Sequence, residues 1–190
     1  MSLTATRLDF RIGLSHVDRG IDITESLVVA QHPSEANEHV ILRVLGWCLL
    51  NEERLAFGPG LSSRGAADLW THDLTGQLVT WVECGAADDD LVRRTMQQHA
   101  GLCAHAVFSS VDRHDTFVRS VRDWKRSPRG ASLTAWLIDT SFVRTLADRV
   151  AKRQAWRVTI VSDHFYIDAD GRTLDGPASR LLLTESNESE

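Results

Sequence analysis

Several features that would assign this 190-residue chain to a specialised class are absent from it. It contains no run of about 18 apolar residues, so the sequence predicts no transmembrane helix and no membrane partner. The first residues lack the apolar segment of a secretory signal. Cysteine is rare, and the three cysteines are too widely spaced to predict a disulfide framework: Cys48, Cys84 and Cys103. We therefore expect a protein of the reducing cytoplasm.

Lysines are also few, and glycine-rich phosphate-binding loops are absent from the sequence. Lys125 and Lys152 are the only lysines, and arginine supplies the other positive charges. Arginine keeps its proton, so it cannot act as a general base. No glycine-rich phosphate loop is present, which argues against P-loop nucleotide hydrolysis. The net charge of −5 disfavours non-specific nucleic-acid binding. The basic run 112–130 indicates a solvated helix face, with a phosphate-facing patch as the alternative.

What is present is the composition of a folded domain, with 43% hydrophobic and 25% charged residues. Apolar periodicity and turn residues predict helices over 35–50, 89–100, 112–126 and 142–152, with Ser34 and Asp88 as N-caps of the first two. Strands are predicted over 4–15, 26–31, 54–57, 77–84, 102–108, 133–138, 156–161, 165–168 and 181–183. The pattern predicts one compact domain of the α/β (α+β) class over 1–184, with a mixed sheet flanked by helices, and a disordered acidic tail over 185–190.

Two carboxylates stand out around the predicted strand 77–84. Asp73 lies in the turn sequence before this strand, and Glu83 lies near the strand's end among apolar residues. Acidic residues are depleted in strands and are rarely buried unpaired. Mg²⁺ takes oxygen ligands and usually only one or two protein carboxylates. The stretch therefore predicts a metal site.

A third carboxylate comes from the first predicted helix. At 100° per residue, Glu38 lies within the stripe formed by Leu42, Leu45 and Leu49, and Glu35 lies at its edge. If the stripe faces the sheet, Glu38 points into the interior, where a carboxylate must be paired or bound to a metal. An internal ion pair with an arginine is the alternative interpretation.

Three stretches of the chain resemble the signature of the YaeQ family. They are His32 to Trp47, Glu53 to Phe57 with Gly60 and Leu61 behind it, and Trp81 to Gly85. Later segments fit the same order more loosely, so the resemblance spans nearly the whole chain. The order of a helix Glu, a turn Asp and a strand Glu is also similar to the acidic pattern of the PD-(D/E)XK nucleases.

The resemblance implies a restriction-endonuclease-like core and a nuclease that uses Mg²⁺, or Mn²⁺, to hydrolyse phosphodiester bonds of nucleic acid. It assigns the helix carboxylate to Glu38, with Glu35 as the second candidate. The turn carboxylate falls on Asp73 and the strand carboxylate on Glu83.

The resemblance also exposes a departure from the nuclease pattern. The superfamily's lysine, two residues after the strand carboxylate, falls on Gly85, which has no side chain. Arg93 or Arg94 on the following helix would have to stand in, and an arginine binds phosphate without acting as a base. The alternative function is a non-catalytic nucleic-acid- or protein-binding module on a degenerate nuclease scaffold. A purely structural acidic cluster is a third interpretation.

Overall fold

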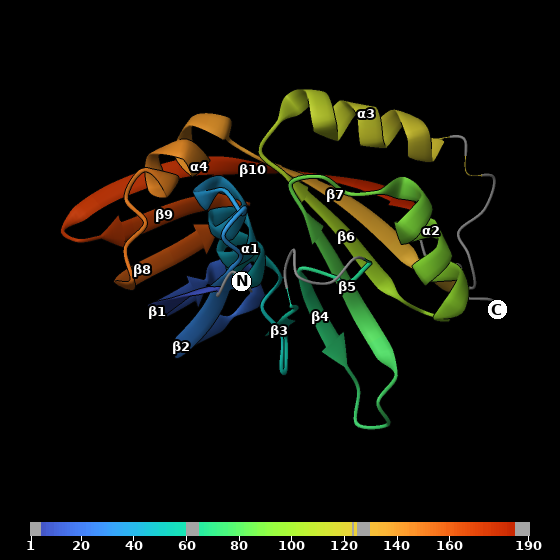
Figure 1. Ribbon diagram of the computed structural model, residues 1–190, viewed down its shortest axis with the longest axis horizontal. Helices are drawn as coiled ribbons and strands as arrows, with labels where there is room; N and C mark the ends of the chain where they lie inside the picture. Colours follow the sequence, from blue (N-terminus) through green and yellow to red (C-terminus); the bar gives the residue numbers. More distant parts are fainter. Residues whose placement is uncertain (1–4, 60–64, 123, 125–129, 185–190) are drawn as a thin grey trace.

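One long, bent sheet runs through the computed structural model, which describes residues 5–59, 65–122, 124 and 130–184. Within these residues ten strands follow the order β2-β1-β8-β9-β10-β7-β6-β5-β4-β3 (Figure 1). Neighbouring strands are antiparallel except for β1 with β8, β5 with β6, and β6 with β7. The prediction of a mixed sheet flanked by helices is confirmed, and the sheet is mostly antiparallel.

The helices are α1 (Asn37–Leu50), α2 (Asp89–Gln98), α3 (Val111–Arg122) and α4 (Thr140–Ala147), with a 3₁₀ turn over Val17–Arg19. The first five strands are β1 (Thr6–His16), β2 (Ile21–Gln31), β3 (Ala56–Phe57), β4 (Leu69–His72) and β5 (Leu78–Cys84). The other five are β6 (Cys103–Phe108), β7 (Ser132–Ile138), β8 (Arg153–Val161), β9 (His164–Ala169) and β10 (Arg172–Thr184).

β10 joins the two halves of the sheet. Its first part, from Arg172 to Pro177, pairs with β9, and its second part, from Ala178 onwards, pairs with β7. One strand thus passes from the half that contains β1, β2, β8 and β9 to the half that contains β3 to β7. Figure 1 shows the two halves turned about α1, which lies between them.

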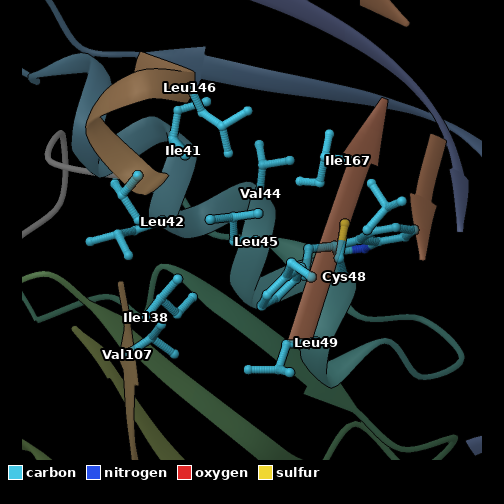
Figure 2. Close-up of a cluster of buried hydrophobic side chains, with 14 of the residues drawn as sticks. Ile41, Leu42, Val44, Leu45, Cys48, Leu49, Val107, Ile138, Leu146 and Ile167 are labelled. Carbon is cyan, nitrogen blue, oxygen red and sulfur yellow. The ribbon is translucent and has the colours of Figure 1, made fainter. Parts of the chain in front are cut away.

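α1 is buried on all sides because both halves of the sheet and α4 pack around it. Every residue from Val40 to Leu49 is buried. Figure 2 shows its side chains directed toward Val107 and Ile138 from one half, Ile167 from the other, and Leu146 of α4. The helices α2 and α3 instead cover the opposite face of β5 to β7, where they form a separate apolar cluster.

Several sequence-based boundaries differ from the structure. Ser34 does not cap α1: its hydroxyl pairs with the His32 ring, and Ala36 occupies the cap position without a side-chain hydrogen bond. Asp88 does cap α2, accepting from the Leu91 N–H. β4 was not predicted, and β10 is ten residues longer than the predicted final strand, because pairing on both sides extends it. The predicted tail, 185–190, lies outside the described residues.

Candidate functional site

A cleft of about 800 Å³ opens where the start of α1 meets the end of β5. It is lined by the start of α1 and the residues before it, the residues before β4, the end of β5 and the residues after it, Leu91 of α2, and the start of α3 with the residues before it. The polar and charged groups among them include Glu38, His39, Asp68, Glu83, Ser110 and Arg113. The cleft therefore brings together polar residues that are up to 79 positions apart in the chain, counting from Ser34 to Arg113.

Glu35, His39 and Arg43 form the inner wall behind the cleft. Their spacing of four residues places them on one side of α1 and of the turn before it. Glu35 Oε1 lies 2.6 Å from His39 Nδ1 and 3.2 Å from Arg43 Nη1, and Glu35 Oε2 accepts from the His32 N–H. Burial raises the pKa of Glu35, but these hydrogen bonds outweigh it, so the pKa is lowered overall. Glu35 is therefore an ionised, fully partnered structural anion.

Arg43 connects α1 with both edges of the sheet, β2 and the segment after β3, by hydrogen bonds. Its side chain is completely buried. Besides Glu35, it donates to the carbonyls of Ala30 in β2 and Gly58 after β3. Gly58 must be a glycine, because a Cβ there would lie 1.9 Å from the carbonyl oxygen of Ala67. This close approach brings the chain segment that carries Asp68 against α1.

Asp68 is held in the cleft by three neighbours. Its Oδ2 accepts from the Cys84 N–H at 2.7 Å, and its Oδ1 lies 3.4 Å from His39 Nε2 and 3.6 Å from Arg43 Nε. Burial disfavours the charged imidazole, but hydrogen bonds to Asp68 and Glu35 outweigh it and raise the pKa of His39 to about 9. His39 is thus a cation at neutral pH, between two carboxylates.

Glu83 differs from the other carboxylates of the site. It is 9% exposed, and among the described residues no hydrogen-bond partner meets its Oε1. Burial, followed by the negative charge of Asp68, raises the pKa of Glu83 to about 8, although Trp81 and His39 oppose the rise. At neutral pH this carboxyl holds a proton, and that proton reduces the repulsion between Glu83 and Asp68.

Of the predicted ligands, Glu38 and Asp73 do not lie where the sequence placed them. Glu38 lines the cleft, but its side chain is exposed, so the prediction that it points into the interior was wrong. The fully buried part of α1 begins only at Val40, two residues after Glu38. Asp73 lies in the β4–β5 turn, where its exposed carboxylate accepts from Thr75 and Gln77. The seven residues of β5 separate it from the cleft by roughly 20 Å.

Arg93 and Arg94 also lie outside the cleft lining. Both are exposed on α2: Arg93 lies over the Trp124 ring at 5.9 Å, and Arg94 Nε donates to the Asp90 carbonyl. The arginine that does line the cleft is Arg113 of α3, whose Nη1 donates to the Gly85 carbonyl at 3.2 Å.

Gly85 has a local reason to lack a side chain. Its φ is +78°, a conformation that disfavours other residues. A Cβ there would approach His39 Cδ2 to 3.2 Å. The imidazole of His39 thus occupies the side on which a side chain at position 85 would begin.

Sequence reasoning missed Asp68 and His39. Asp68 stands between apolar residues, Ala67 and Leu69, where a carboxylate is unusual, and this signal could have identified it. His39 follows Glu35 by one helical turn, which could have suggested the pair. No group of three or more His, Cys, Asp or Glu side chains within the described residues has the arrangement of a metal site. All three cysteines are free, and no described helix has the length and apolar character needed to cross a membrane.

Comparison with known proteins identifies the family. Residues 1–176 match the family model described as YaeQ protein, and the chain belongs to this family. It is 26% identical to "Uncharacterized protein YaeQ" of Escherichia coli (strain K12) over 183 residues, covering 92% of this chain and 94% of that one. The protein of the same name from Salmonella typhi is 25% identical over 165 residues, covering 84% and 86%.

Two solved structures share the fold. The crystal structure of YaeQ protein from Xanthomonas axonopodis pv. citri has a TM-score of 0.82 at 25% identity and covers 96% of this chain and 99% of that one. The Pseudomonas syringae YaeQ structure has a TM-score of 0.79 at 23% identity, covering 93% and 96%. The overall fold described above is therefore shared with both of these YaeQ structures.

Proposed function

We propose that the cleft between Asp68 and Glu83 binds a divalent metal ion, Mg²⁺ or Mn²⁺, and that this YaeQ-family chain hydrolyses phosphodiester bonds of nucleic acid there. In this proposal the core is a variant of the PD-(D/E)XK fold, and the segment α1-β3-β4-β5-α2-β6 carries the site. Asp68 takes the role that the sequence assigned to Asp73. We place this activity in the cytoplasm, in keeping with the three free cysteines.

The observation that carries the proposal is Glu83 Oε1, which lies in the same cleft as Asp68 and has no hydrogen-bond partner among the described residues. A buried carboxyl oxygen without a partner is costly unless something compensates it. Two carboxylates suffice for Mg²⁺, which keeps several of its water molecules and needs no all-protein cage. In this proposal Asp68 and Glu83 would be the two protein ligands of the ion, and water would complete the coordination.

The protein's own groups would divide the remaining work. Asp68 is held in one orientation by the Cys84 N–H, and Glu83 would give up its proton on binding the ion. The His39 imidazolium and Arg113, both in the cleft lining, would contact the non-bridging oxygens of the phosphate. The bound ion would supply charge stabilisation of the phosphate and lower the pKa of a water molecule.

Calorimetric titration of Mg²⁺ and Mn²⁺ at pH 7 tests the metal site. Binding should release a proton from Glu83, so the measured enthalpy should depend on the ionisation enthalpy of the buffer. Glu83→Gln and Asp68→Asn should abolish binding, and the exposed Asp73→Asn should leave it unchanged. Equal metal affinity in wild type and Glu83→Gln would refute the site.

Cleavage is tested separately on single- and double-stranded DNA and RNA. Metal-dependent cleavage that is lost in Glu83→Gln and retained in Asp73→Asn is the expected result. Intact substrates in every case, together with tight metal binding, would instead support the alternative function. That alternative, a non-catalytic nucleic-acid- or protein-binding module, is favoured by Gly85, which leaves the cleft without the usual lysine.

A further inference from the structure

β2 is the edge strand at the opposite end of the sheet from β3, and two of the residues that commonly protect an edge are absent from it. It runs for eleven residues, Ile21–Gln31, and contains neither lysine nor proline. Proteins commonly blunt such edges with these residues, because the unpaired N–H and C=O groups of an edge accept another strand. An exposed edge of this length therefore needs an explanation.

The register shows which peptide groups of β2 point outward. The Asp9 N–H donates to the Lys152 carbonyl beside β8, so the peptide groups of Asp9 point away from β2. Its partner Val28 then belongs to a non-hydrogen-bonded pair, and the peptide groups of Val28 point away from β1. The pairing continues without a bulge. The same orientation therefore holds for Ser26, Thr24 and Asp22.

Within the part of the chain that the structure describes, the outward edge is covered at one end and borders a groove at the other. Near its C-terminal end, the Ala30 carbonyl accepts from Arg43, which also binds the Gly58 carbonyl. This contact fastens β2 to the segment after β3. Toward its N-terminal end, β2 instead borders a groove of about 840 Å³, whose other wall is the loop 51–55 between α1 and β3.

The groove combines an apolar floor with an acidic rim. Ile21, Ile23 and Leu27 of β2, with Trp47 and Leu55, supply the apolar lining. The charged lining groups are four carboxylates and two guanidinium groups: Asp22, Glu25, Glu52, Glu53, Arg19 and Arg54. The carboxylates thus outnumber the guanidinium groups by two, which gives the groove a net negative charge.

We propose that this groove is a docking site for an extended, basic peptide segment of a partner protein, which adds as a strand to β2. The outward N–H and C=O groups of residues 22, 24 and 26 would pair with its backbone, as in other strand-addition complexes. Side chains on one face of the peptide would enter the groove, where apolar groups would contact the floor and a lysine or arginine would meet Glu25 and Glu53. A basic side chain on the other face would meet Asp22. A second copy of this chain is the less suitable occupant, because two acidic rims would repel each other.

A labelled peptide of alternating lysine and valine is the probe, and its binding is followed by fluorescence anisotropy against the full chain. Two control peptides replace lysine by glutamate, or carry N-methyl groups on alternate residues so that one backbone edge cannot pair. The lysine peptide should bind and weaken with salt. The glutamate peptide should not bind, and N-methylation should weaken binding about tenfold or more, since several backbone hydrogen bonds are lost.

The protein variant is Glu25→Lys with Glu53→Lys, matched by Asp115→Lys with Asp148→Lys on α3 and after α4. All four positions are exposed or partly exposed, so both variants should fold. The first variant should weaken the lysine peptide about tenfold, because attraction at two positions becomes repulsion, and the matched variant should not.

Three results would overturn the proposal. One is the absence of saturable binding up to about 1 mM peptide. Another is that one of the two controls has no effect: either both protein variants bind the lysine peptide with equal affinity, or the wild type binds the N-methylated peptide as tightly as the unmodified one. The third is a dimer, seen by analytical ultracentrifugation, that the Glu25→Lys/Glu53→Lys variant dissociates, since this would assign the groove to a second copy.

Discussion

The buried carboxyl of Glu83 should make the stability of the metal-free protein fall as the pH rises. Its pKa is about 8 in the folded protein, against an ordinary value of 4.5 for a glutamate side chain. Between these two values the unfolded chain has lost the proton and the folded chain still holds it. Rising pH therefore favours the unfolded state throughout this window. The contribution is fully present below pH 4.5 and is lost as the pH passes through about 8.

The size of this effect follows from the same two values. Each pKa unit corresponds to about 1.4 kcal/mol, so the difference amounts to about 4 to 5 kcal/mol at most. That is a large part of the 5 to 15 kcal/mol by which domains are typically stable. Glu83→Gln keeps a neutral side chain of similar shape and removes the titration. We expect the variant to match the wild type near pH 5 and to exceed it by several kcal/mol at pH 9.

Urea denaturation in the presence of EDTA, at intervals from pH 5 to pH 9, measures the free energy of unfolding for both proteins. Glu38→Gln is the matched control, because Glu38 lines the same cleft but is exposed. His39, with its pKa raised from 6.5 to about 9, contributes a second decrease above pH 6.5 that both proteins should share. Parallel curves for wild type and Glu83→Gln would contradict this prediction, because they would show that Glu83 is not buried as a neutral carboxyl.

Three further predictions concern stability. Arg43→Met should cost about 3 to 5 kcal/mol, measured by urea denaturation, because it leaves Glu35 and Asp68 without their buried guanidinium partner. Leu45→Ala should cost about 2 to 5 kcal/mol in the same assay, since Leu45 is fully buried between the sheet halves; a smaller loss would mean that the helix can collapse onto the cavity. Asp73→Ala should increase amide hydrogen exchange in the β4–β5 turn without changing Mg²⁺ binding, and unchanged exchange would contradict its role in the turn.

The local elements were predictable where one face of a segment is apolar and the ends carry clear signals. α2 is an example, because its cap residue Asp88 and its first turn are visible in the sequence. The helix α1 was found, but its orientation was not. Both sheet halves bury it, so its apolar residues surround the axis, and no single stripe could show that Glu38 would be exposed.

The site was predictable only in part for a related reason. Glu83 could be recognised because a carboxylate among apolar strand residues is unusual at any position in a sheet. Asp73 attracted attention as a turn aspartate, and its role is the ordinary one of a hydrogen-bond acceptor within a turn. Asp68 is distant from Glu83 in the sequence, but the β4–β5 hairpin places Leu69 beside Val82 and the Asp68 carboxylate on the Cys84 N–H. The two carboxyl groups therefore meet only in the folded chain.

The amino-acid sequence determined the family, the mixed class of the sheet and the presence of a buried strand carboxylate, because motifs, periodicity and an apolar context are local properties. The tertiary structure alone decided which charges meet. β10 turns the two sheet halves around α1, Arg43 joins their edges, and this closure brings Asp68, His39 and Glu83 to one cleft. Such convergence depends on contacts between distant segments, and no spacing within the chain encodes them directly.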